Sequence, residues 1–184
     1  MKTILPLFAL ALLLNAVPSA AEPGGKLILN GETEDCALFR ALNGSEAVPD
    51  ECKDGDSKSI YARKVEPPKT VVLDRITFDF NSNQLTPDAE NDLSRVAKVM
   101  RYPVSASQVY RLDGYTDLKG DAYYNLKLSK RRAAAVRKYL VSIGVPSSRM
   151  DSEGFGSQKL ADPDHPYDLV NRRVEIVNLS QGVN

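Results

Sequence analysis

The sequence predicts a domain of the α+β class, in which strands and helices alternate from residue 71 onward. Strand-like runs rich in β-branched, aromatic or Leu residues occur at residues 71–80, 109–115 and 173–179. Helical patterns fill the intervals between these runs. In addition, 42% of the 184 residues are hydrophobic and 26% are charged, which is typical of a globular chain.

The charge of the whole chain is balanced, with 24 Lys and Arg against 24 Asp and Glu. Affinity for nucleic acid depends on many Lys and Arg side chains that neutralise phosphates, so this balance argues against a general nucleic-acid binder. The charge is unevenly distributed along the chain. Residues 22–70 carry ten acidic and seven basic side chains, whereas residues 71–184 carry 14 acidic and 16 basic ones.

Residues 1–21 have the layout of a secretory signal peptide. A positive start is followed by an apolar run of eleven residues, Ile4 to Leu14, and then by small residues up to Ala21. Eleven residues are too few to cross a bilayer core, which needs about 20 helical residues. We therefore expect export with cleavage after Ala21 and no transmembrane segment in the mature chain. The alternative is a retained interfacial anchor.

Residues 22–70 form a small N-terminal segment ahead of the regular pattern. We expect its two cysteines, Cys36 and Cys52, to form a disulfide, because an exported chain reaches an oxidising compartment. Apolar residues at helical spacing precede Asn43-Gly44, which predicts a short helix pinned by this disulfide. The adjacent prolines at 67 and 68 favour a linker or edge segment at its end.

The first helix of the regular region is predicted from Pro87 to about Arg101. Thr86 is a suitable N-cap, Pro87 is suited to the first helical position, and acidic residues follow where they face the helix dipole. One apolar stripe then recurs at helical spacing. Its members are Leu93, Val96, Ala97 and Met100.

The second predicted helix carries a cation on its apolar face. Arg132 lies four residues after Leu128 and three before Ala135, whereas the neighbouring cations point elsewhere, as expected of a solvated face. A buried Arg needs an anionic partner, because an unpaired charge in a core costs several kcal/mol. The stripe comprises Leu128, Ala135, Val136, Tyr139, Leu140 and Ile143.

Asp117 is a candidate partner of Arg132, at the end of the predicted strand 109–115. In folds that alternate strands and helices, the loops leaving the strand ends bind ligands. A guanidinium binds a carboxylate and a carboxylate binds an ammonium, so the two residues suit a zwitterionic ligand. A structural salt bridge between Asp117 and Arg132 explains the same spacing equally well.

Three ordered blocks of residues make the chain similar to a known family. They resemble the C-terminal domains of OmpA-like proteins over about 110 residues, from Val71 to roughly Ser180. The blocks are Phe78-Asp79-Phe80-Asn81 with Leu85; Gly114-Tyr115-Thr116-Asp117, Gly120, Tyr124-Asn125, Leu128-Ser129, Arg132-Ala133 and Val136; and Gly154-Phe155-Gly156 with Asn171-Arg172-Arg173-Val174-Glu175-Ile176.

The resemblance implies a mixed β-sheet with helices packed on one face, in a βαβαββ arrangement over residues 71–184. It also implies a non-catalytic periplasmic module without a cofactor, associated with the outer membrane or cell wall. Such a module binds peptidoglycan noncovalently through the diaminopimelate of the stem peptide. In the family an Asp and an Arg grip diaminopimelate, and they correspond to Asp117 for the ammonium and Arg132 for the carboxylate.

Other positions of the family's pocket also have counterparts in this chain. Thr116, Asn125 and Asn81 match residues that line the pocket. Arg172 and Arg173 match the family's Asn-Arg-Arg block, where a structural ion pair and a pocket role remain open.

Two further function classes are compatible with parts of the pattern. One is an accessory component of a Tol, stator or secretion complex, with an envelope partner that contacts residues 22–70. The other is a wall hydrolase, which is disfavoured because bridged cysteines leave no Cys/His pair for nucleophilic catalysis. His165 is the single histidine, so no second histidine is present to hold zinc with it, and we expect it on the surface without a metal site.

Overall fold

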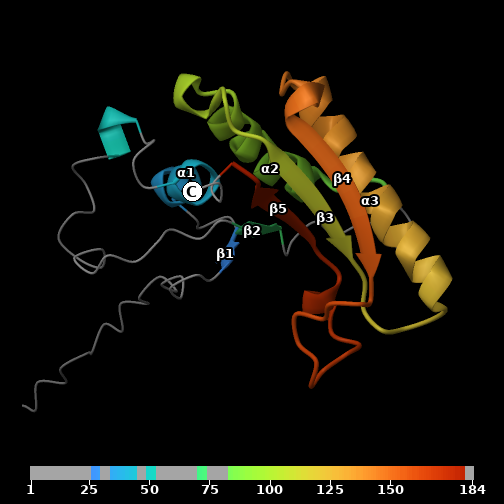
Figure 1. Cartoon of the computed structure of the whole chain (residues 1–184). Coiled ribbons are helices and arrows are strands. Elements are labelled where there is room, and N and C mark those ends of the chain that lie inside the picture. The colour runs from blue at the N-terminus through green and yellow to red at the C-terminus, as the bar shows by residue number, and fades with distance from the viewer. Residues whose placement is uncertain (1–25, 30–33, 45–48, 53–69, 74–82, 181–184) are drawn as a thin grey trace, which may run out of the picture.

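The computed structural model describes residues 26–29, 34–44, 49–52, 70–73 and 83–180. These residues form one open mixed sheet with the strand order β1-β2-β5-β3-β4 (Figure 1). β1 is parallel to β2 and β3 is parallel to β4, whereas β5 runs antiparallel to both β2 and β3. The strands are β1 Lys26–Ile28, β2 Thr70–Leu73, β3 Tyr110–Tyr115, β4 Met150–Gly156 and β5 Val174–Asn178.

Helices cover one face of this sheet (Figure 1). α2 (Pro87–Met100) and α3 (Ala122–Ser142) connect β2 to β3 and β3 to β4, and α1 (Asp35–Asn43) packs beside α2. From β2 onward the order is βαβαββ, as predicted. None of the helices within the described ranges is long and apolar enough to cross a membrane.

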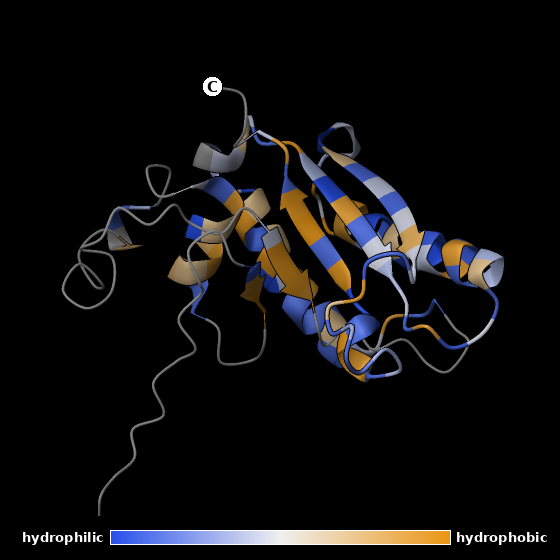
Figure 2. Cartoon of the chain, turned by 60° about the horizontal axis from the view of Figure 1, so that its bottom comes forward, coloured by the Kyte–Doolittle hydropathy of each residue, from blue (hydrophilic) through white to orange (hydrophobic). Residues whose placement is uncertain are grey.

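Successive side chains along a strand point to opposite faces of the sheet, and Figure 2 shows the resulting interleaved hydrophobic and hydrophilic bands. This alternation determines which face packs against the helices. Tyr110 and Leu112 of β3 are fully buried in the core under the helices. Arg111 and Asp113 point to the opposite face, where Nε and Nη2 of Arg111 donate to the Asp113 carboxylate at 2.7 and 2.8 Å. One face is therefore an apolar core, and the other carries charged side chains, of which Asp113 and Glu175 are buried.

The predicted strands agree with the structure where the structure describes them. The run 109–115 corresponds to β3, which begins one residue later, and the run 173–179 corresponds to β5, which is one residue shorter at each end. Of the run 71–80, β2 covers Thr70–Leu73, and residues 74–80 lie outside the described residues. β1 and β4 were not predicted from strand propensity, because β1 has only three residues and β4 contains two glycines.

The start of α2 forms as its sequence predicts. The Thr86 hydroxyl oxygen accepts a hydrogen bond from the Ala89 N–H at 3.3 Å, and Pro87 occupies the first turn. Every member of the predicted stripe is buried, and the helix ends at Met100, one residue before the predicted end. The sequence pattern thus determined both the bounds and the buried face of this helix.

The predicted disulfide and short helix are both present in the N-terminal segment. Cys36, in the first turn of α1, is bonded to Cys52 across a separation of 16 residues. The helix ends at Asn43, and Gly44 takes a φ of 85°, a conformation that favours glycine. The Arg40 guanidinium donates to the Cys52 carbonyl at 2.7 Å, which ties the far end of the loop to the helix.

Residues on both sides of position 70 share one hydrophobic core. Leu29, Leu38 and Leu42 are fully buried in the same cluster as the α2 and β5 side chains. The Tyr110 hydroxyl donates to Asn43 Oδ1 at 3.2 Å, which joins α1 to β3. The described part of the N-terminal segment therefore packs into the same core as the residues that follow it.

Candidate functional site

The site is built at the loop that leaves the carboxyl end of β3. Asp117 lies in this loop, and its Oδ1 accepts the Lys119 N–H at 3.2 Å, which orients the carboxylate. Asp121 caps the following helix by accepting the Tyr124 N–H at 2.9 Å. The Asp117 side chain is 13% exposed, so it is largely enclosed and still reachable from solvent.

Asn125 holds the same loop from the first turn of α3. It is buried, and its Nδ2 donates to the Lys119 carbonyl at 3.0 Å and, more weakly, to the Asp117 carbonyl at 3.5 Å. These contacts fix the backbone at Asp117 and two residues after it. The structure thus gives this predicted pocket residue a role in shaping the loop.

Arg132 lies on the buried face of α3, as its spacing predicts, and only 8% of it is exposed. Side chains on a helix lean toward its N-terminus, which brings this guanidinium back toward the loop after β3. Burial lowers the pKa of Arg132 most, the charge of Arg172 lowers it further, and Asp117 acts in the opposite direction. The Arg132 cation is therefore held at an electrostatic cost that an added anion would reduce.

Two glycines bring α3 unusually close to the sheet. A Cβ on Gly114 of β3 would lie 2.2 Å from the Ser129 carbonyl oxygen, and one on Gly154 of β4 would lie 2.4 Å from the Lys130 nitrogen. In this contact Ser129 Oγ also accepts the Gly156 N–H at 2.9 Å. The close approach determines how far the Arg132 side chain lies from the ends of β3 and β4.

Arg172 forms an ion pair with Asp117, which is one of the two roles that the sequence left open for this arginine. Arg172 Nε lies 3.3 Å from Asp117 Oδ2, and the arginine side chain is 40% exposed. Sequence spacing pointed to Arg132 because it considered only the helix that follows the loop. Arg172 directly follows the short helix η4 (Leu169–Asn171) and lies 55 positions after Asp117 in the chain. Only the tertiary fold therefore brings the two residues together.

Arg173 faces the opposite side of the backbone from Arg172 and has structural partners. Its Nε donates to Glu175 Oε1 at 2.7 Å, both side chains being 3% exposed, and its Nη2 donates to the Lys159 carbonyl at 3.2 Å. Its guanidinium carbon lies 4.0 Å from the centroid of the Tyr115 ring. Of the two roles left open for Arg173, these contacts favour the structural one.

Asn171 is a site-forming residue whose role the sequence did not predict. It is fully buried, and its side chain accepts the Asp162 N–H and donates to the carbonyls of Asp162 and His165. The Leu118 N–H donates to the Pro166 carbonyl at 2.9 Å, which joins this loop to the loop of Asp117. Asn171 therefore fastens the segment that presents Arg172.

The remaining predicted pocket residues are Thr116 and Asn81, of which the structure describes only Thr116. Thr116 is 1% exposed, and its hydroxyl has no hydrogen-bond partner among the described residues, although its N–H donates to the Gly156 carbonyl at 2.9 Å. A buried hydroxyl without a partner is uncommon and favours a ligand or water contact next to Asp117. Asn81 lies outside the described residues.

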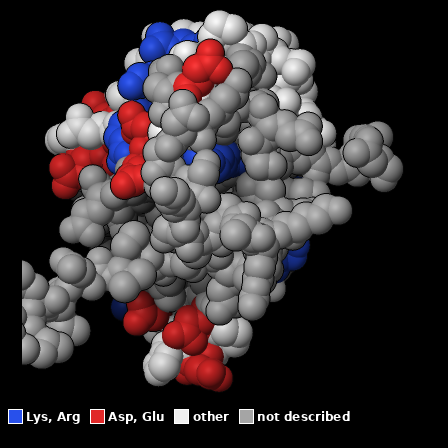
Figure 3. Space-filling model, turned by 90° about the vertical axis from the view of Figure 1, so that its left-hand side faces the viewer, with Lys and Arg blue, Asp and Glu red and all other residues white. Residues whose placement is uncertain are grey.

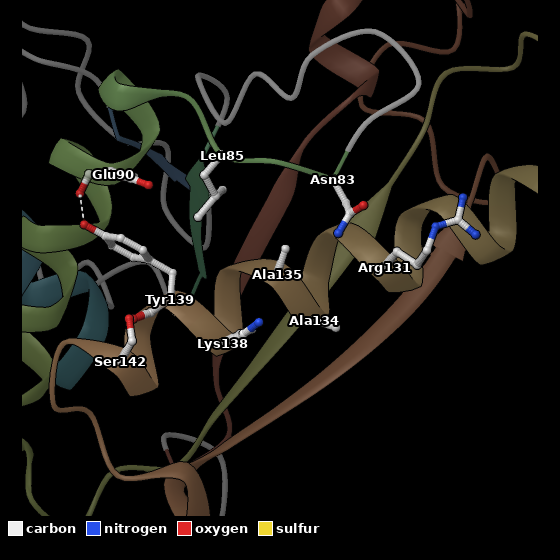
Figure 4. Close-up of a pocket in the computed structure, with 9 residues that line it drawn as sticks. All are labelled: Asn83, Leu85, Glu90, Arg131, Ala134, Ala135, Lys138, Tyr139 and Ser142. Carbon is white, nitrogen blue, oxygen red and sulfur yellow. Dashed lines mark hydrogen bonds between the residues drawn. The ribbon is translucent and has the colours of Figure 1, made fainter.

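A groove of about 490 Å³ lies elsewhere, between α3 and the segment that leads into α2 (Figure 4). The Tyr139 hydroxyl donates to the Glu90 carbonyl at 3.3 Å at one end of it. Its walls are mainly apolar and do not include Asp117 or Arg132, so the groove is distinct from the charged site at the end of β3. Ala135, predicted to be buried, lines the groove and is only half-buried, because Ala133 takes the packed position.

The rest of the described surface carries charges of both signs. On the face drawn in Figure 3, acidic and basic side chains of the described residues lie in small mixed groups. His165 is exposed, as predicted, and its Nδ1 lies 2.8 Å from Asp162 Oδ2. Across the described ranges, no group of three or more His, Cys, Asp or Glu side chains is arranged to hold a metal ion.

Comparisons with known proteins agree with this fold and motif. The peptidoglycan-associated lipoprotein of Brucella melitensis is 37% identical over 111 residues, which cover 58% of this chain and 64% of that protein. The protein of the same name from Agrobacterium fabrum is 45% identical over 89 residues, 48% of this chain and 49% of that protein. The chain therefore spans less than two thirds of the length of either relative.

A solved structure extends the likeness from sequence to fold. The peptidoglycan-associated lipoprotein of Burkholderia pseudomallei superposes with a TM-score of 0.50 at 27% identity, covering 56% of this chain and 87% of that one. The sequence profile of the OmpA family matches residues 77–173, which include Asp117, Arg132 and Arg172. On this match, which spans more than half of the chain, the protein belongs to the OmpA family.

Proposed function

We propose that this protein is a non-catalytic periplasmic module that binds peptidoglycan noncovalently, through the diaminopimelate of the stem peptide. The observation that carries the proposal is the ion pair of Asp117 with Arg172 at the end of β3, together with the buried Arg132, on whose pKa the charges of both residues act. A carboxylate next to buried guanidinium is a receptor for a zwitterion. Asp117 receives the ammonium of diaminopimelate and Arg132 its carboxylate.

The relatives support the wall as the target. Both relatives described above are named peptidoglycan-associated lipoproteins, and the OmpA family match over residues 77–173 includes the residues of the site. Export by residues 1–21 would deliver the chain to the compartment where peptidoglycan is accessible. The protein then attaches itself, or a partner bound elsewhere on its surface, to the cell wall.

The test is a pull-down of the purified mature protein on sacculi. We expect Asp117→Asn and Arg132→Gln each to weaken binding by at least about tenfold, because each removes a charge-assisted contact to a ligand group. Matched controls are Asp151→Asn and Arg101→Gln, exposed residues near the opposite ends of the strands, which should bind as the wild type does. Thermal unfolding checks that every variant is folded.

A purely structural role for the two residues predicts a different result. Arg132→Gln would then lower the melting temperature while the folded variant retained its affinity for sacculi and for free meso-diaminopimelate. Undiminished binding by both folded site variants would reject the proposal.

A further inference from the structure

Asp117 is already engaged by a cation of the protein itself. Its Oδ1 accepts the Lys119 N–H, and its Oδ2, the oxygen left for a ligand ammonium, lies 3.3 Å from Arg172 Nε. A ligand ammonium that binds this oxygen therefore competes with the Arg172 guanidinium for the same carboxylate. The arginine is the more exposed partner, 40% against 13%, so it is the group that can withdraw into solvent.

The backbone that carries Arg172 is fixed on both sides. Before it, the buried Asn171 side chain makes three hydrogen bonds to the loop at Asp162 and His165. After it, Arg173 is held by Glu175 and by the Tyr115 ring. The Arg172 guanidinium can thus leave the Asp117 carboxylate by a change of its own side-chain conformation, while the backbone on both sides of it stays in place.

The site combines two positive charges with one negative charge. Asp117 is the anion, and Arg132 and Arg172 are the cations, which repel each other enough to contribute to the lowered pKa of Arg132. If an amine without a carboxylate displaced Arg172, both guanidinium groups would lose attraction to Asp117 and gain no anion in return. A zwitterion that binds Asp117 through its ammonium also supplies a carboxylate to the two arginines.

We propose that Arg172 is a specificity-determining residue, which occupies the ammonium position on Asp117 in the free protein and so favours zwitterions over simple amines. This role rests on the proposed function and adds a selection rule to it. The ion pair is partly exposed and therefore weak, so its displacement discriminates between ligands without blocking the site. Polyamines should therefore bind weakly, because they carry no carboxylate. The same holds for Lys side chains in a peptide, whose nearest carboxyl group is part of a peptide bond.

The experiment compares two ligands on the wild type and on Arg172→Gln. The affinities of meso-diaminopimelate and of 1,5-diaminopentane, which has the same amine spacing and no carboxylates, are measured by NMR titration of the mature protein. We expect Arg172→Gln to bind 1,5-diaminopentane about two- to fivefold more tightly than the wild type does, the range that a partly exposed ion pair supports. The preference for diaminopimelate should fall accordingly.

The control is Arg101→Gln, which removes an exposed arginine near the opposite end of β3 and should leave both affinities unchanged. If 1,5-diaminopentane binds Arg172→Gln no more tightly than the wild type, the role of Arg172 is wrong. That includes the case in which only diaminopimelate binding falls, since Arg172 would then serve only as a carboxylate ligand and would not exclude simple amines. A wild type that binds neither sacculi nor diaminopimelate instead rejects the proposed function itself.

Discussion

Single residues of this protein depart from their local pattern where the site is built. Arg132 interrupts an apolar helix face, Thr116 has a buried hydroxyl without a partner among the described residues, and Asn171 is fully buried in a loop. Each departure costs stability unless something compensates it, because buried polar groups lose their water. Asn171 is compensated by its hydrogen bonds, whereas the Thr116 hydroxyl is a group that a ligand or a water would stabilise.

His165 and Asp162 give the loop beside the site a defined pH dependence. The hydrogen bond and charge of Asp162 raise the pKa of His165 above its ordinary 6.5, and the same hydrogen bond lowers the pKa of Asp162 below its ordinary 3.8. The stability that protonated His165 contributes to the folded protein is complete below pH 6.5 and is lost as pH rises through the pKa of His165 in the folded protein. The aspartate contribution is complete above 3.8 and is lost as pH falls, so the pair stabilises the loop most at about pH 4 to 6.5.

An NMR titration can check this because the chain has one histidine. We expect the imidazole C–H resonance of His165 to report a pKa above 6.5 in the wild type. Asp162→Asn should bring this pKa back toward 6.5, and Asp151→Asn, an exposed acid on β4, should leave it unchanged. An equal pKa in the wild type and in Asp162→Asn would show that the ion pair does not form in solution.

Among the elements, α3 depends on its close contact with β3 and β4. Gly114 and Gly154 leave no room for a Cβ between the helix backbone and the strands. These glycines are therefore required by packing and not by an unusual backbone angle. The contact places Arg132 at the strand ends, so the element that carries the buried cation also determines its position relative to Asp117.

Replacement of either glycine should push α3 away from the sheet. We expect Gly114→Ala and Gly154→Ala each to lower the free energy of unfolding by about 1–3 kcal/mol, because the new Cβ meets backbone atoms that cannot move aside. Denaturant unfolding measures this loss, and Ser148→Ala at an exposed position should stay within about 0.5 kcal/mol of the wild type. Stability equal to the wild type in both glycine variants would contradict the close contact.

At the scale of the whole molecule, the N-terminal segment is built into the domain. β1 extends the sheet beside β2, Leu38 and Leu42 of α1 enter the common core, and Lys26 pairs with Glu175 of β5. The Asp35 carboxylate also accepts from Arg95 of α2 at 3.1 Å. The disulfide thus stabilises a segment that closes one edge of the core.

A core substitution in α1 tests whether the molecule unfolds as one unit. We expect Leu38→Ala to lower the free energy of unfolding by about 2–5 kcal/mol, the usual cost of a cavity at a fully buried leucine. The loss should appear in a single transition, followed together by tyrosine fluorescence and far-ultraviolet circular dichroism. Val141→Ala, at a residue that is 37% exposed, is the matched control and should cost far less.

A separate early transition in Leu38→Ala, with the main transition unchanged, would show that the N-terminal segment folds independently. That outcome would restore the division at residue 70 as a boundary between folding units. It would leave the site unaffected, since Asp117, Arg132 and Arg172 all lie on the C-terminal side of this position.

The sequence by itself predicted the helices, three of the five strands and the residues that we propose for the site. Periodicity and capping residues are local properties, and they predicted α2, the disulfide-pinned α1, β3, β5 and the buried position of Arg132. The motif spacing identified Asp117 in the same way, because a strand, a turn and the next helix are consecutive in the chain.

Only the tertiary structure decided which groups meet. The pairing of Asp117 with Arg172, the entry of α1 into the common core and the edge strand β1 all join residues that are far apart in the chain. Local patterns cannot predict such contacts, because long-range pairing depends on how every element packs at once. The physical reason is that burial and charge pairing act on distance in space, whereas propensity and periodicity act on distance along the chain.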